Sequence, residues 1–231
     1  MDYVFEPAPQ ASVAVTNSDS RFPVRRIFCV GRNYAAHARE MGHDPDRDPP
    51  FFFTKPADAV VDDGAIIPYP PLTKNFHFEA ELVVAIGKRG RNISEVHSLD
   101  YVWGYAIGND LTRRDLQGVA KDKGRPWDWG KAFDRSAPCG PVHPVSSVGH
   151  LSEGSIKLSV NGATKQDADL NELIWSVPEV ISILSKSMEL QPGDLIYSGT
   201  PAGVGKLEKG DVCVVEIAGL GELTTTISES S

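Results

Sequence analysis

Residues 76–87 read FHFEAELVVAIG, and this stretch decides how the chain folds. Its apolar part, residues 82–86, is nearly continuous, which predicts a β-strand buried on both faces. Glu79 and Glu81 stand two positions apart, and side chains at that spacing in a strand point to the same face. Two neighbouring carboxylates repel each other unless a cation or a proton lies between them. Alternating acids are more often the solvated face of a strand, but a buried strand requires partners for them.

A third carboxylate and a lysine belong to two further runs. Residues 102–110 read VWGYAIGND, which predicts a second apolar strand with Asp110 at its end. Lys131 lies in the run WGKAFD at residues 129–134. Three carboxylates without a nearby cysteine favour a hard divalent cation such as Mg²⁺ or Mn²⁺. The sequence therefore indicates a metal site at Glu79, Glu81 and Asp110.

The composition is typical of one globular domain. The chain has 231 residues, of which 41% are hydrophobic and 23% charged, and its formal net charge is −8. No basic cluster stands out, so nucleic acid is not an expected partner. No apolar run approaches the ~20 residues that span a membrane, and the first residues lack the features of a secretory signal. Three cysteines, far apart in the sequence, favour the reducing cytoplasm.

Short strands separated by glycine and proline dominate the chain. We expect residues 1–24 to form an irregular N-terminal arm, residues 25–231 a single domain, and residues 42–50 a mobile loop. Strands are predicted at residues 26–30, 51–54, 75–86, 102–109, 156–160, 163–166, 195–198, 212–217 and 222–227, and helices at residues 34–41, 112–121 and 177–187. Because strands outnumber helices, we predict a β-rich α+β fold rather than a doubly wound sheet.

His37 and Glu40 are candidates for acid–base chemistry. They stand three residues apart in the predicted helix and therefore share one of its faces. A carboxylate beside a histidine orients the ring and raises its basicity, as a general base requires. The alternative is an ordinary surface pair. The neighbouring loop favours the first interpretation. A helix between Gly31 on one side and the loop at residues 42–50 on the other resembles a lid that closes over a site.

A glycine-rich turn and a second lysine complete the candidates. Residues 199–205 read GTPAGVG and lack the spacing of a dinucleotide fingerprint. Their backbone N–H groups and the Thr200 hydroxyl could hold a carboxylate, or the segment could be a tight turn between strands. Lys55 follows a buried-looking strand and is either a cation for a substrate or a solvated turn residue.

Taken together, these runs resemble the fumarylacetoacetate hydrolase family. The matching motifs, in family order over about residues 26–226, are GRNYxxH, FxxKP, FExEL, GxxxxNDLTxRD, KxFD and GDxIxxGTPxGVG. The resemblance implies a distorted β-barrel or rolled β-sandwich with short helices, and a homodimer. It also implies Mg²⁺ or Mn²⁺ held by Glu79, Glu81 and Asp110. The catalytic residues would be His37, Glu40 and Lys131, and the residues lining the substrate pocket would be Arg32, Lys55, Gln117 and Thr200.

Within the family the chain is similar to the short acylpyruvase and fumarylpyruvate hydrolase branch. The resemblance implies metal-dependent hydrolysis of the C–C bond of an acylpyruvate, a 2,4-diketo acid, with fumarylpyruvate giving fumarate and pyruvate in gentisate-type aromatic degradation. The alternatives are an oxaloacetate decarboxylase or keto–enol tautomerase, a decarboxylase-isomerase of homoprotocatechuate breakdown, and a metal-binding domain without enzymatic activity. The distal carboxylate of a fumaryl group needs a cation, and the sequence does not choose among Arg25, Arg32, Arg39, Arg113 and Arg125.

Overall fold

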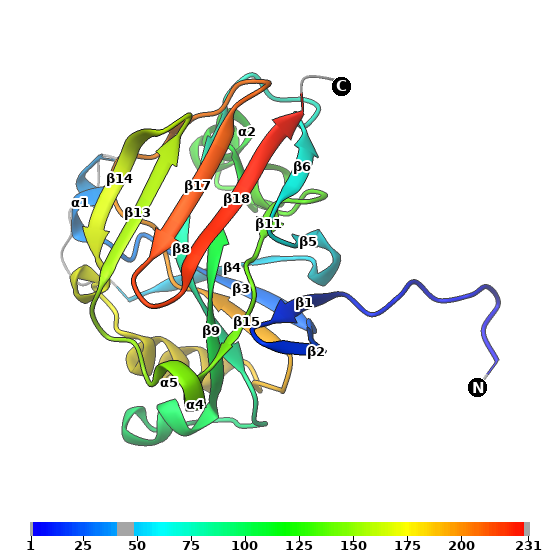
Figure 1. Ribbon diagram of the computed structural model, residues 1–231, viewed down its shortest axis with the longest axis vertical. Coiled ribbons are helices and arrows are strands. Elements are labelled where there is room, and N and C mark those ends of the chain that lie inside the picture. The colour runs from blue at the N-terminus through cyan, green and yellow to red at the C-terminus, as the bar shows by residue number, and fades with distance from the viewer. Residues whose placement is uncertain (1, 41–48, 229–231) are drawn as a thin grey trace.

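The computed structural model describes residues 2–40 and 49–228, and it has the strand-rich α+β fold that the sequence predicts. Two large sheets make up most of the molecule (Figure 1). The loop predicted at residues 42–50 falls mostly outside the described residues. In the described part of the chain, no helix has the length and apolar character needed to cross a membrane.

The larger sheet has six strands and provides most of the candidate site. In spatial order its strands are β12 (His143–Pro144), β9 (Val102–Asn109), β8 (Ala80–Ile86), β15 (Asp194–Tyr197), β3 (Arg26–Gly31) and β4 (Phe51–Lys55). β15 and β3 run parallel, and the remaining neighbours run antiparallel.

β8 lies between two hydrophobic clusters, which explains its unbroken apolar sequence. All seven of its residues are buried. Leu82 and Val84 belong to a cluster that includes the second large sheet. Val83 and Ala85 belong to another cluster, which includes Cys29 of β3. The prediction of a strand buried on both faces is therefore confirmed.

The second large sheet has five strands and faces the viewer in Figure 1, with β8 and β9 behind it. Its strands, in spatial order, are β14 (Ala163–Asp169), β13 (Ser155–Val160), β17 (Val212–Ile217), β18 (Gly221–Ser228) and β6 (Ala65–Pro68). A hairpin joins β13 to β14, two of the predicted strands, through Asn161 and Gly162, whose φ angles of 51° and 78° suit a type I′ turn. Alternate residues of β13 are buried against the six-stranded sheet.

Short elements connect and cover these sheets. The small strands are β5 (Val60–Val61), β7 (Phe76–Phe78), β10 (Thr112–Arg113), β11 (Ala137–Pro138) and β16 (Gly205–Lys206), with β7 paired between β10 and β16. The helices are α1 (Ala35–Glu40), α2 (Arg114–Asp122), α3 (Asp128–Lys131), α4 (Val145–Val148) and α5 (Val177–Ser187), and the 3₁₀ turns are η1 (Ala57–Ala59), η2 (Glu95–Tyr101) and η3 (Leu170–Glu172). Among the described residues no sheet closes on itself, so a barrel or rolled sandwich stays a prediction.

Three predicted segments differ from the structure. The helix predicted at residues 112–121 begins at Arg114, because Thr112 and Arg113 pair as β10 with β7. The strand predicted at residues 75–86 is interrupted at Glu79, between β7 and β8. The irregular arm predicted at residues 1–24 contains a hairpin of β1 (Ser12–Val15) and β2 (Ser18–Pro23), whose Val13 and Phe22 are buried. A hairpin this short gives too few alternating residues for a pattern to show. Residues 2–7 extend away from the sheets (Figure 1), whereas the Ala11 carbonyl accepts a hydrogen bond from Val24.

Replacing Ile156 with alanine should destabilise the protein by about 2–5 kcal/mol, because the deletion leaves a cavity in a fully buried position. The matched control is Ile66→Ala in the same sheet, where the side chain is 67% exposed, and its cost should stay within about 0.5 kcal/mol. Urea denaturation measures both. Equal losses for the two variants would contradict the described packing.

Candidate functional site

Three carboxylates converge at one end of the pairing between β8 and β9. Glu79 lies at the break before β8, Glu81 lies within β8, and Asp110 follows β9. All three are buried, and one oxygen of each lies within 4.8 Å of the others. The Asp110 N–H donates to the Glu79 carbonyl (2.8 Å), which holds the two segments in register. The structure thus brings together the three residues that the sequence singled out.

Cations surround two of these carboxylates. The Lys131 ammonium donates to Glu79 (2.8 Å), to Asp110 (2.6 Å) and to the Thr112 hydroxyl (2.7 Å). Arg114 donates to the other oxygen of Glu79. Lys131, expected to act on the substrate, therefore directs all three of its N–H bonds at the protein. It also lines the pocket, where its charge can still act.

Lys55 does not lie where the sequence placed it. It was expected to line the substrate pocket, but its side chain is fully buried and the pocket lining does not include it. Its ammonium lies 2.8 Å from Asp110 Oδ1 and donates to the carbonyls of Leu111 and Lys131. Lys55 therefore compensates the charge of Asp110 from a buried position outside the pocket. The motif FxxKP did not reveal which way the side chain points.

The three carboxylates differ in their electrostatic surroundings. Burial alone would raise the pKa of Glu79, but Lys131, Arg114 and His37 outweigh it and lower that pKa. Burial raises the pKa of Glu81 well above its ordinary value, and the charges of Asp110 and Glu79 raise it further. Lys131 keeps a raised pKa despite burial, because Asp110 and Glu79 favour its charged form. Glu81 is therefore the carboxylate that most needs another cation.

The donor atoms fit a hard divalent cation. Asp110 Oδ1 is buried, and its contact with Lys55 lacks hydrogen-bond alignment, so within the described residues it accepts no hydrogen bond. Glu81 accepts a hydrogen bond of 2.7 Å from the Gly199 N–H. Oxygen atoms alone make up the set, as Mg²⁺ and Mn²⁺ prefer.

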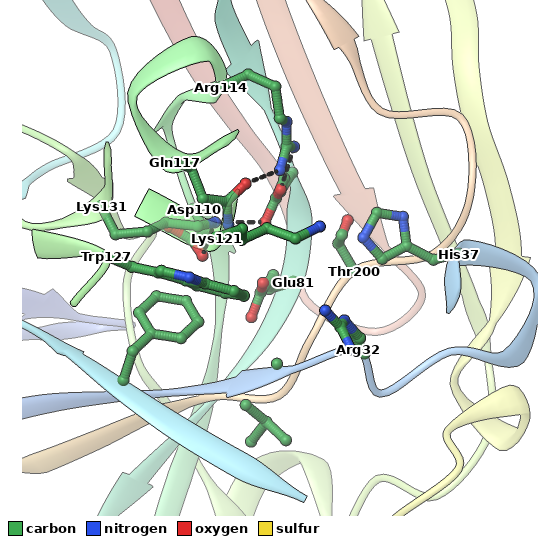
Figure 2. A pocket seen from close by; sticks show the side chains of 14 residues that line it. Arg32, His37, Glu81, Asp110, Arg114, Gln117, Lys121, Trp127, Lys131 and Thr200 are labelled. Carbon is green, nitrogen blue, oxygen red and sulfur yellow. Dashed lines mark hydrogen bonds and ion pairs between the residues drawn. The ribbon is translucent and has the colours of Figure 1, made fainter. Parts of the chain in front are cut away.

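His37 and Glu40 form the pair expected from their spacing on α1. His37 Nδ1 lies 3.2 Å from Glu40 Oε2, and the histidine is buried. Because a carboxylate only accepts, Nδ1 carries the proton and Nε2 keeps its lone pair. Burial lowers the pKa of His37 below its ordinary value of 6.5, although Glu79 and the hydrogen bond to Glu40 oppose this shift. The ring is therefore neutral at neutral pH and directed into the pocket (Figure 2).

The glycine-rich turn holds carboxylates, but they belong to the protein itself. The Gly199 N–H binds Glu81, and the Gly203 N–H binds Glu40 at 3.1 and 3.2 Å from its two oxygens. Gly203 has a φ of 95°, and a Cβ there would lie 2.1 Å from the Lys165 carbonyl oxygen. The turn therefore links the carboxylate cluster to the helix that bears His37. Thr200 lines the pocket, as expected.

One face of α2 forms a further wall of the pocket. Arg114, Gln117 and Lys121 lie at positions i, i+3 and i+7 and all line it (Figure 2). Gln117 Oε1 accepts a hydrogen bond of 2.7 Å from Arg114, and in the described part of the chain its amide NH₂ group has no acceptor and can donate to a ligand. Of the expected pocket residues, Arg32, Gln117 and Thr200 are present. Arg114 and Lys121 were missed. Arg114 lies within the motif NDLTxRD, and the helical spacing of Arg114, Gln117 and Lys121 is visible in the sequence.

Comparison with known proteins agrees with this site. Residues 26–228 match the family model described as fumarylacetoacetate (FAA) hydrolase C-terminal. The chain belongs to the fumarylacetoacetate hydrolase family. The match covers every residue of the carboxylate cluster, the His37–Glu40 pair and the glycine-rich turn.

Several members of this family are similar over most of their length. A fumarylpyruvate hydrolase of Ralstonia sp. is 47% identical over 189 residues, which are 81% of this chain and 98% of that protein. The crystal structure of a fumarylpyruvate hydrolase from Pseudomonas aeruginosa, in complex with Mn²⁺ and pyruvate, superposes with a TM-score of 0.96 at 53% identity and covers 98% of this chain and 99% of that one. The mitochondrial oxaloacetate tautomerase of Homo sapiens is 39% identical, over 89% of this chain and 92% of that protein.

Replacing Glu81 with glutamine should weaken Mn²⁺ binding by more than roughly tenfold. Changing a residue that only hydrogen-bonds to a metal ligand already costs about that much, and Glu81 is expected to be a ligand itself. Titration calorimetry with Mn²⁺ measures this without relying on turnover. The control is Glu216→Gln, which removes an equal charge from an exposed position on β17. Unchanged affinity in Glu81→Gln would show that Glu81 is not a ligand.

Replacing Gly203 with alanine should cost at least about 1–3 kcal/mol and reduce activity, because the backbone must shift and Glu40 loses its N–H donor. The control is Gly219→Ala, which has a similar φ of 82° and open space around the added Cβ. Thermal denaturation compares the two variants. If both lose the same stability, the close approach to Lys165 is not what requires glycine.

Proposed function

We propose that this protein is a metal-dependent hydrolase that cleaves the C3–C4 bond of an acylpyruvate, with fumarylpyruvate as its substrate. The observation that carries the proposal is one pocket that holds both the carboxylate cluster and a neutral, carboxylate-backed His37. The fumarylpyruvate hydrolases at 47% and 53% identity support it. The homodimer implied by the resemblance and the cytoplasmic location favoured by the cysteines stay predictions.

Two groups of this chain perform the hydrolysis. His37 Nε2 takes a proton from water, whose oxygen attacks the C4 carbonyl of the substrate. The NH₂ group of Gln117 donates to the oxyanion that forms there. The C3–C4 bond then breaks, the acyl group leaves as a carboxylic acid, and pyruvate leaves as its enolate, which receives the proton from His37.

The cluster contributes the charge that favours this cleavage. When bound by Glu79, Glu81 and Asp110, Mg²⁺ or Mn²⁺ supplies a Lewis acid that favours negative charge on the 2-oxo acid. Lys131 adds a fixed positive charge beside the same oxygens. Arg32 and Thr200 line the space left for the acyl group.

Keto–enol conversion of oxaloacetate is the second candidate, favoured by the oxaloacetate tautomerase that is 39% identical. That reaction needs the same stabilisation of an enolate but no attacking water. The His37–Glu40 pair suits hydrolysis, in which His37 activates water, and the higher identity of the fumarylpyruvate hydrolases, 47% and 53%, favours that reaction.

A substrate panel tests the proposal. Fumarylpyruvate, acetylpyruvate and oxaloacetate are offered to Mn²⁺-loaded protein, with and without chelator. Chelator-sensitive release of fumarate and pyruvate from fumarylpyruvate supports the hydrolase. Turnover of oxaloacetate alone would favour the tautomerase or decarboxylase.

Replacing His37 with alanine should lower kcat/KM for fumarylpyruvate roughly 10²–10⁴-fold, the usual effect of losing a general base, while Mn²⁺ binding is retained. His97→Ala, at an exposed histidine, is the control. Steady-state kinetics and Mn²⁺ calorimetry on the same preparations separate the two effects. A variant that hydrolyses at the full rate would rule out His37 as the base.

The pH dependence should reflect the buried histidine. Since burial lowers the pKa of His37, its neutral form persists to lower pH, and kcat/KM at saturating Mn²⁺ should fall only below pH 6.5. Glu40→Gln removes a contact that raises this pKa, so the acidic limb should move to still lower pH as the rate falls. An acidic limb with its midpoint above pH 6.5 would contradict this assignment.

A further inference from the structure

The pocket has a second charged end, away from the carboxylate cluster. Lys121 projects into it from the last turn of α2, and Arg32 enters from the connection between β3 and α1 (Figure 2). Among the described residues that line the pocket, the acidic ones are Glu79, Glu81 and Asp110, and all three belong to the cluster. Within this part of the chain, Lys121 and Arg32 are therefore the charged groups at the opposite end.

Lys121 has no evident structural task. Among residues 2–40 and 49–228, no ion pair or hydrogen bond to its ammonium is found, in contrast to Lys55 and Lys131. Its pKa is lowered by partial burial and by the nearby charges of Arg32 and Arg114, which outweigh its neighbour Asp122. Two cations that repel each other in a partly buried pocket are stabilised by an anion between them.

Arg32 has a constrained backbone and an aromatic contact. Its φ of 57° lies in the left-handed region, which few residues other than glycine adopt, and its guanidinium lies 5.4 Å from the centre of the Phe51 ring. The other four arginines considered from the sequence do not line the pocket. Arg25, for example, pairs with Asp194 at 3.0 Å, and Arg113 lies over the Phe133 ring.

The spacing along α2 suits a linear substrate. Arg114, at the start of the helix, binds Glu79 of the cluster, and Lys121 lies seven residues further, or roughly 10 Å along the axis at 1.5 Å per residue. Gln117 lies between them on the same face. A substrate extended along this face has one end at the cluster and the other at Lys121.

We infer that Lys121, together with Arg32, binds a second carboxylate at the far end of the substrate, so that the site selects acylpyruvates whose acyl group is itself a carboxylic acid. This inference rests on the proposed function and names the substrate class. Acetylpyruvate lacks the second carboxylate, and fumarylpyruvate carries it. The two substrates therefore separate recognition of the far end from the chemistry at the cluster.

The test is Lys121→Gln, compared with Lys123→Gln, a control at an exposed lysine two residues further along that does not line the pocket. Lys121→Gln should lower kcat/KM for fumarylpyruvate roughly 10- to 100-fold, mainly through KM, as expected for the loss of one charge-assisted hydrogen bond. Its kcat/KM for acetylpyruvate should change less than about threefold. Lys121→Arg should restore most of the loss.

Equal losses for both substrates, or no loss for fumarylpyruvate, would overturn the inference. Binding of fumarate to Mn²⁺-loaded protein, measured by calorimetry, decides the same question without turnover: binding that weakens in Lys121→Gln but not in Lys123→Gln supports the site, and unchanged binding overturns it. Failure of the proposed function gives a different result, namely a wild-type protein that hydrolyses neither acylpyruvate.

Discussion

The ion pairs of Lys131 with Glu79 and Asp110 are the interaction on which the rest of the site depends. They join α3 to the break before β8 and to the end of β9, at distances of 2.8 and 2.6 Å. Arg114 extends the network to α2, and Lys55 extends it to β4. Because these charges are buried, removing one partner leaves another uncompensated, which typically costs about 3–5 kcal/mol. The same contacts thus position the catalytic groups and connect the elements that carry them.

The fold was predictable where a pattern has a single physical meaning. The unbroken apolar run of β8 requires burial on both faces, and the Asn161-Gly162 pair requires a tight hairpin. The break at Glu79 was not predictable, because β7 pairs with β10 and β16, which come from distant parts of the chain. The hairpin of β1 and β2 was missed for the same reason: tertiary packing of Val13 and Phe22, rather than local pattern, stabilises it.

The site was predictable to the extent that spacing determines direction. Glu79 and Glu81 point together because they stand two residues apart, and His37 and Glu40 meet because they stand three apart. Lys55 was expected to line the pocket but lies buried against Asp110, since a residue at the end of a strand has no pattern to orient it. Arg114 and Lys121 of α2 were missed for a different reason. Polar residues at helical spacing are equally typical of an ordinary solvated helix, and only the neighbouring strands make that face a wall of the pocket.

The number of charges in the buried network has a consequence for product release. Three carboxylates face three protein cations, Lys55, Lys131 and Arg114, so with all three ionised, as metal ligation requires, the network is electrically neutral. A divalent ion then adds two positive charges to those of Lys121 and Arg32, which line the same pocket. Hydrolysis converts a doubly ionised dicarboxylic diketo acid into fumarate and pyruvate, which together carry one more negative charge, and a proton. The pocket therefore attracts the two ionised products more strongly than the substrate, and this attraction opposes their departure.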